Sequence, residues 1–252
     1  MRKVFIIMLL ALTLGLQAQG KNLWEDNSYY VRLGYNLGGT APVGMPETIR
    51  GLSRYTLIPN LLIGMDIQKP LGNHWGLMLG LHVEDKDMKT DARVKSYHMA
   101  MQQGGQSLEG LFTGQVVTEV TLGMVTIPVL ATYDLSSKVR LKGGPYVSFV
   151  YNREFSGYAY DGYLRVGDPT GNKVDIGSER GTRGTYDFSD DLRKLQVGID
   201  VGADWYFSRR WGASLDLAWG VNGIFKKDFN VIDDTLFPIY GTIGVIYKIN
   251  ND

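Results

Sequence analysis

The stretch from Leu195 to Val221 constrains the fold of this chain most, because it alternates apolar and small or polar residues over two long segments. Every odd position in 195–207 and again in 211–221 is apolar, whereas the even positions are mainly Gly, Asp, Ser and Gln. Successive side chains of a strand point to opposite faces, so one face of each segment is wholly apolar. A core strand of a soluble protein rarely keeps seven apolar positions in a row. We interpret this stretch as a transmembrane β-hairpin, with one face in lipid and the other in a narrow polar lumen.

The N-terminus has the pattern of a secretory signal peptide. Arg2 and Lys3 precede an apolar run over 4–16, and Ala18 follows it. We expect a signal peptide over 1–18, a periplasmic segment over 19–28 and an outer-membrane barrel over 29–252. An N-terminal membrane anchor is the weaker alternative, because a spanning helix needs about 20 apolar residues. The sequence contains no Cys, which excludes a lipidated N-terminal cysteine and disulfides.

Six further segments alternate in the same way, which brings the predicted number of strands to eight. They lie at 29–37, 57–68, 75–84, 116–135, 139–152 and 239–249. Short turns are expected at 71–74, 136–138 and 208–210, and long loops at 38–54, 84–112, 153–191 and 226–236. Short and long connections alternate, as in membrane barrels with short periplasmic turns and long outer loops. The predicted fold is therefore an all-β, eight-stranded antiparallel up-and-down transmembrane β-barrel with both ends in the periplasm.

Aromatic residues support this arrangement. Five of them lie beside a short turn or the C-terminus, as in the interfacial ring of a membrane barrel: Trp75, Tyr133, Phe207, Trp211 and Tyr247. The alternative is a soluble lipocalin-like barrel with the apolar face inward. In such a barrel the large apolar side chains would exceed the volume of the lumen. The opposite face also lacks the Lys and Glu expected of a surface in water.

The predicted lumen face carries charges of both signs. Eight strands enclose a space that side chains just fill, and buried charges need partners. An interior network that closes the barrel is therefore the first interpretation, and a narrow ion or proton path is the second. A wide pore would need about 16 strands. The lumen residues are Arg32, Asp66, Glu84, Arg140, Lys142, Asp200, Asp204, Asp216 and Lys248.

Three other groups of residues are candidate sites. Ser96 and His98 would share a strand face, as in a lipid-modifying barrel enzyme, but no third group that orients the His is evident. Asp85, Asp87 and Asp91 alternate with Lys86 and Lys89, which favours a solvated loop over a divalent-cation site. We therefore predict no catalytic residue, cofactor or metal. Tyrosines among Gly and Asp suit either an outer recognition surface or packing over the barrel mouth: Tyr158, Tyr160, Tyr163 and Tyr186.

Charge excludes one class of partner. The sequence has 26 basic and 26 acidic residues, and losing the signal peptide removes Arg2 and Lys3. The resulting small negative balance argues against nucleic-acid binding.

The sequence resembles the PorT-like outer-membrane β-barrel family of Gram-negative bacteria. The resemblance is carried by 31–36 (VRLGYN), 127–130 (IPVL), 144–147 (GPYV) and the Gly-rich hairpin over 197–219. It spans roughly 29–249 and marks a fold more than an activity. It implies location in the cell outer membrane and, from the namesake, a part in exporting proteins across that membrane. It brings no catalytic residues.

We therefore expect a non-enzymatic outer-membrane barrel with a structural or interaction role, one form of which is an accessory of protein export. A narrow ion or small-solute channel is the first alternative, and a lipid-modifying barrel enzyme is the second. The expected partners are outer-membrane lipid and the barrel-insertion machinery. Secretion components or an extracellular ligand are further candidates.

Overall fold

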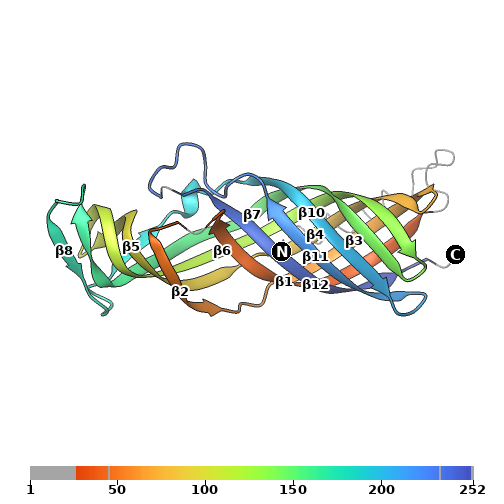
Figure 1. Cartoon of the computed structure of the whole chain (residues 1–252), viewed down its shortest axis with the longest axis horizontal. Helices are drawn as coiled ribbons and strands as arrows, with labels where there is room; N and C mark the ends of the chain where they lie inside the picture. The colour runs from red at the N-terminus through yellow and green to blue at the C-terminus, as the bar shows by residue number, and fades with distance from the viewer. Residues whose placement is uncertain (1–26, 45, 233, 251–252) are drawn as a thin grey trace.

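The computed structural model describes residues 27–44, 46–232 and 234–250, and the predicted signal peptide and its cleavage site lie outside these residues. The described chain is all-β apart from the short 3-10 helix Ser189–Asp191. No helix in it is long and apolar enough to cross a membrane. The strands, shown in Figure 1, are β1 (Ser28–Pro42), β2 (Ile49–Thr56), β3 (Leu61–Gly72), β4 (Trp75–Asp85), β5 (Met88–Gln103), β6 (Gln106–Ser136), β7 (Val139–Val166), β8 (Lys173–Ile176), β9 (Gly184–Asp187), β10 (Leu195–Tyr206), β11 (Trp211–Gly220) and β12 (Leu236–Lys248).

The expected total of eight strands is too low, because the sheet has twelve. Eight of the twelve follow a closed circuit of antiparallel pairs, in the order β1, β3, β4, β6, β7, β10, β11, β12 and back to β1. A closed circuit leaves no unpaired sheet edge at this end of the molecule. The other four strands lie beyond it.

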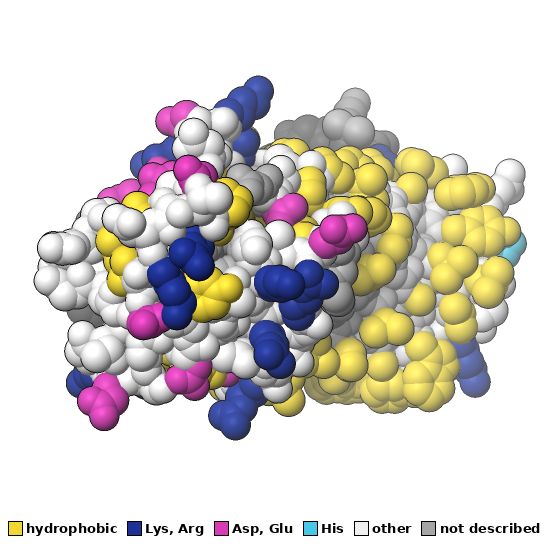
Figure 2. Space-filling model, turned by 60° about the vertical axis from the view of Figure 1, so that its left-hand side comes forward, with side chains coloured by type: hydrophobic (Ala, Val, Ile, Leu, Met, Phe, Trp, Pro, Cys, Tyr) yellow, Lys and Arg dark blue, Asp and Glu magenta, His cyan; other side chains and the backbone are white. Residues whose placement is uncertain are grey.

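The faces of the circuit are those predicted. Ile199 and Leu217 point outward and are 53% and 48% exposed, whereas Asp204 and Ser214 are buried inside. Figure 2 shows the apolar side chains as a band over this end of the molecule. Because the apolar face points outward, the lipocalin-like alternative is wrong.

The predicted turns and aromatic ring are also present. The β3–β4 turn uses positive φ at Gly72 (97°), Asn73 (48°) and His74 (70°), a conformation that Gly and Asn tolerate best. Trp75 packs on Tyr133 with ring centroids 5.0 Å apart. Trp211 likewise packs on Tyr247 at 4.8 Å. Turns and aromatic pairs thus mark one end of the circuit.

At the other end β6 and β7, with 31 and 28 residues, run far past the circuit and carry the remaining strands. β5 pairs with the outer half of β6, β2 with β5, and β8 and β9 with the outer half of β7. We call this part the outer extension; it lies on the left of Figure 1. Its interior holds most of the buried apolar cluster, including Met99, Phe112 and Leu164. The expected loops over 84–112 and 153–191 are therefore wrong in large part, and that over 38–54 contains the end of β1 and the start of β2.

β-Bulges explain why the pattern hid these strands. The pairing of β5 with β6 shifts between Val94 and Tyr97, and Ser96 lies in the bulge with φ of 52°. A bulge adds one residue and so moves the inward face from even to odd positions. Before it Met88 and Val94 are buried, and after it Met99 is. A strict period of two therefore fails across the bulge.

Candidate functional site

The interior of the barrel holds a network of buried charges, the lumen network, centred on Arg32 of β1. Its guanidinium donates from Nε to Asp66 Oδ2 and from Nη1 to Asp216 Oδ2, both at 3.0 Å. Its Nη2 lies 3.6 Å from Asp204 Oδ1. The planar fork of Arg suits such multiple carboxylate contacts. One side chain thus ties together strands β1, β3, β10 and β11.

Lys142 of β7 completes this half of the network. Its ammonium lies 2.6 Å from Asp204 Oδ1 and 2.8 Å from Asp216 Oδ1. His82 Nε2 contacts the other oxygen of Asp66 at 2.7 Å. Because all these groups are buried, each charge depends on its partners.

A second pair lies further along the lumen, where Lys86 Nζ contacts Glu84 Oε1 at 3.0 Å. Thr126 donates to the same carboxylate at 2.6 Å, and the ammonium of Lys86 lies over the rings of Tyr146 and Tyr240. Lys86 is fully buried, so a solvated loop is the wrong interpretation for this residue. The sequence did carry a signal, since 82, 84 and 86 have the same parity.

A third group lies near the short turns. Arg140 donates from Nε to Asp134 Oδ1 at 2.6 Å and from Nη1 to the hydroxyl of Tyr30 at 3.0 Å. Tyr206 also accepts from this guanidinium at 3.3 Å. These contacts close the turn end of the lumen with an aromatic and charged layer.

Two of the predicted lumen residues differ from the rest. Asp200 lines the small central cavity, and its Oδ1 is buried without a hydrogen-bond partner among the described residues. Lys248 is half-buried near the C-terminal end of β12, where its backbone N–H donates to Arg210. The structure therefore brings seven of the predicted residues into buried contacts. They form three groups: the cluster around Arg32, which includes His82, the cluster around Glu84, which includes Lys86, and the group around Arg140 at the turn end.

Little space remains between these side chains. The cavity that Arg32, Lys142 and Asp200 help to line has a volume of about 20 Å³. A cavity that holds a single water has a volume of roughly 10–15 Å³ on this scale. The lumen network thus fills the centre of the barrel.

The other candidate residues lie in or near the outer extension. Ser96 is in the bulge of β5, and His98 Nδ1 contacts the carbonyl of Val231 at 3.0 Å. Asp87 accepts from the backbone of Leu122, and Asp91 accepts from Tyr160 at 2.7 Å. Within the described ranges no group of three or more acidic, His or Cys side chains could hold a metal. These carboxylates act as hydrogen-bond acceptors between strands.

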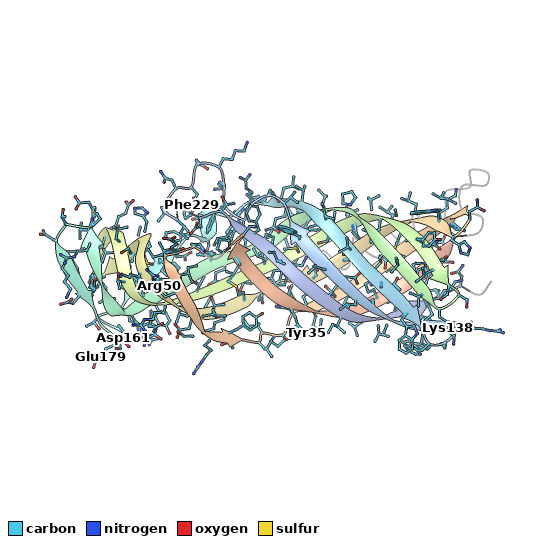
Figure 3. All side chains as sticks on the ribbon, viewed as in Figure 1. Tyr35, Arg50, Lys138, Asp161, Glu179 and Phe229 are labelled. Atoms are coloured by element: carbon cyan, nitrogen blue, oxygen red, sulfur yellow. The ribbon has the colours of Figure 1, made fainter. Side chains whose placement is uncertain are left out.

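The four tyrosines split between packing and surface. Tyr186 is buried and its hydroxyl contacts the carbonyl of Val117 at 2.8 Å, so packing is its role. The rings of Tyr158 and Tyr160 are 5.7 Å apart, with the guanidinium of Arg183 4.4 Å from the ring of Tyr158. Figure 3 places Asp161 and Glu179 at the end of the extension farthest from Lys138, which lies in a short turn. The far end of the molecule is thus polar.

The chain is similar to solved structures and matches one protein family. Solved structures similar to the chain include Ail, the attachment invasion locus protein of Yersinia pestis, at 8% identity over 88% of this chain and 99% of that chain, with a TM-score of 0.36. Neisserial surface protein A is similar at 10% identity over 89% and 100%, also with a TM-score of 0.36. No curated protein matches the sequence. Residues 17–226 match the family described as "Outer membrane protein beta-barrel domain". Because this match covers most of the chain, the protein belongs to that family of outer-membrane β-barrels.

Proposed function

We propose that this protein is a non-conducting, non-enzymatic outer-membrane barrel that holds the outer extension at the cell surface for binding. The observation that carries the proposal is the lumen network, which leaves a central cavity of only about 20 Å³. A barrel closed in this way is a poor channel. Four of the twelve strands lie outside the circuit, which favours a binding role for the outer extension.

The charges themselves favour a closed lumen. Arg32 and Lys142 share Asp204 and Asp216, so an ion path past them would separate several buried pairs at once. Breaking one buried pair costs about 3–5 kcal/mol. We infer that the closed arrangement dominates.

Half-buried tyrosines beside basic side chains suit the extension to recognition. Arg183 lies over Tyr158, and Lys173 lies 5.0 Å from the ring centre of Tyr163. Tyr with small polar neighbours offers contact area at low entropic cost. A protein or other extracellular ligand is the proposed partner, besides outer-membrane lipid and the insertion machinery.

The membership in a PorT-like subgroup and the role in protein export stay predictions from sequence resemblance. The surface and secreted proteome of a strain that lacks this chain tests the role. Selective loss of one cargo class would support an export accessory, and an unchanged proteome would contradict it.

Conductance tests the closed lumen. The purified barrel in a planar bilayer should show no steady single-channel current. A variant with Arg32, Lys142 and Asp216 all changed to Ala should conduct, because it removes the centre of the network. Steady current through the wild-type barrel would overturn the proposal.

A further inference from the structure

A second, much larger cavity lies where the barrel meets the outer extension. Its volume is about 540 Å³, within the roughly 300–1,000 Å³ of small-molecule sites. It lies between the outer ends of β1 and β12 on one side and β2, β5 and β6 on the other. It is distinct from the lumen cavity, with which it shares no lining residue.

The lining of this cavity is uncharged. None of the residues around it is Asp, Glu, Lys, Arg or His, and apolar side chains such as Met88, Met99 and Phe155 dominate. Its polar atoms are largely engaged within the protein; for example, the hydroxyls of Thr118 and Tyr186 contact each other at 2.8 Å. An ion in this space would lose its hydration without gaining a partner. The lining therefore selects an apolar occupant, and the methionines adapt to a flexible one.

The position of the mouth indicates where such an occupant comes from. Leu52 and Tyr55 line the cavity and are also exposed, at 57% and 37%. Ile239 lines it as well and lies on the same face of β12 as Ile243 and Val245, which belong to the lipid-facing band. The cavity is thus continuous with the established membrane-facing surface, at its outer border.

Cationic side chains flank this mouth. Arg50 and Arg54 are exposed on β2, two residues on either side of Leu52. Figure 3 shows Arg50 in the part of the molecule between the barrel and the far end of the extension. Basic side chains at a membrane surface attract anionic headgroups. Apolar cavity and basic rim together match an amphiphile with a phosphate group.

We propose that this cavity binds one acyl chain of an anionic outer-leaflet lipid, with the headgroup phosphate at Arg50 and Arg54. The inference deepens the proposed function, since it gives the outer extension a lipid ligand, and it rests on that function only in assigning binding to the extension. The chain would enter between the end of β1 and β2, and leave the lumen network untouched.

Photo-crosslinking tests the site. The full barrel is placed in nanodiscs that contain a trace of phosphatidylglycerol with a diazirine at the end of one acyl chain, and adducts are mapped by peptide mass spectrometry. We expect adducts on Met88–Met99 of β5 in addition to those on the lipid-facing band. Adducts confined to the band would overturn the proposal.

Two pairs of variants sharpen this test. Ala92 lines the cavity, so Ala92→Phe should cause loss of the β5 adducts, whereas Ala131→Phe on the exposed face of β6 should leave them. Leu52→Asp at the mouth should also cause their loss, and Ser53→Asp beside it should not. Because Leu52 is exposed, this second pair remains informative if Ala92→Phe fails to fold. Unchanged β5 adducts in Leu52→Asp would contradict the proposed entry.

Further outcomes distinguish a phospholipid from a free fatty acid as the source of the acyl chain, and failure of the lipid site from failure of the closed-lumen function. A diazirine fatty acid added from outside that labels β5, while the phospholipid does not, would replace the lipid source with a free amphiphile and so overturn the proposal. A barrel that conducts but is labelled on β5 overturns only the closed-lumen function. A silent barrel without β5 label overturns only the lipid site.

Discussion

Two leucines at different depths of the lipid-facing band allow one substitution to test the whole assignment of faces. Leu217 of β11 is 48% exposed and lies six residues from Trp211 in the aromatic ring. Leu135 of β6 is 62% exposed and lies beside the short turn at 136–138. Both point outward, so Leu→Arg places the same charge on the same face at two depths.

The structure sets the expected difference. At about 3.4 Å per residue, six residues give about 20 Å along the strand. With a tilt of about 40°, this is about 15 Å along the membrane normal, near the middle of an apolar band about 25 Å tall. Arg costs about 2–4 kcal/mol at the midplane and about 0–1 kcal/mol near the interface. We therefore expect Leu217→Arg to lower the free energy of unfolding by about 2–4 kcal/mol and Leu135→Arg by less than about 1 kcal/mol.

The measurement is reversible denaturant unfolding of the barrel in liposomes, followed by Trp fluorescence. Asp216→Asn serves as a second control, since Asp216 points into the lumen, where it pairs with Arg32 and Lys142. Equal losses for the two Leu→Arg variants would refute the membrane depth. A Leu217→Arg variant as stable as the wild type would refute the assignment of faces, because a register shift of one residue inverts every face.

Three other perturbations probe the interior and the extension. Lys142→Met should destabilise the barrel by about 3–5 kcal/mol, because it leaves Arg32 as the one cation of the described chain paired with two buried carboxylates, and adding Asp204→Asn should recover part of this loss in the same unfolding assay. Tyr186→Phe should destabilise the outer extension by about 1–3 kcal/mol and speed its limited proteolysis, because it removes the hydroxyl that contacts the carbonyl of Val117, while a protease-resistant variant would contradict the role of this hydrogen bond. The hydrogen bond to Asp91 raises the pKa of Tyr160 to about 12; its stabilising effect is therefore full below about pH 10, where the unfolded side chain is neutral, and is lost as the pH rises toward 12. Tyrosinate absorbance should lose a component near pH 12 in Tyr160→Phe, and an unchanged titration would contradict this hydrogen bond.

The barrel was predictable because apolar and polar residues alternate strictly along its strands. One face of each strand contacts lipid and the other faces the polar lumen. The hairpin over 195–221 is an example: Ile199 and Leu217 are exposed, while Asp204 is buried. The alternation depends only on the pleat of the strand and the polarity of each side. No tertiary information is needed for it, and the faces of this hairpin were predicted correctly.

The extension was hidden because bulges interrupt that period. On β7 the pairing with β6 shifts at Tyr151, so buried positions change from Ser148 and Val150 to Phe155 and Ala159. The predicted strand ended at residue 152, where the parity breaks. Bulges are set by the pairing partner, which a single sequence does not reveal. Lys86 is a different case: it lies in the short connection after β4, and its burial follows the parity of 82 and 84.

The site was likewise predictable in part, where it depends on the alternation along a strand, and hidden where it depends on which strands pair. Charges on the lumen face were found by parity alone, and seven of them make buried contacts. The large apolar cavity was not predicted, because its lining comes from strands that meet only in the folded extension. Met88 on β5 and Ile239 on β12 are far apart in sequence and share no pattern.

The interior of β6 changes character along one continuous face, and this change locates the outer border of the membrane. Thr126 points inward and donates to Glu84, as part of a polar lumen. Met124 and Leu122, the next inward positions, are wholly buried in the apolar cluster of the extension. Below this point lipid provides the apolar environment and the interior is polar; above it water surrounds the strands and the interior must supply the apolar core. The large cavity adjoins this inversion, where apolar surface faces both inward and outward, and a lipid chain is the molecule that can occupy both sides of such a border.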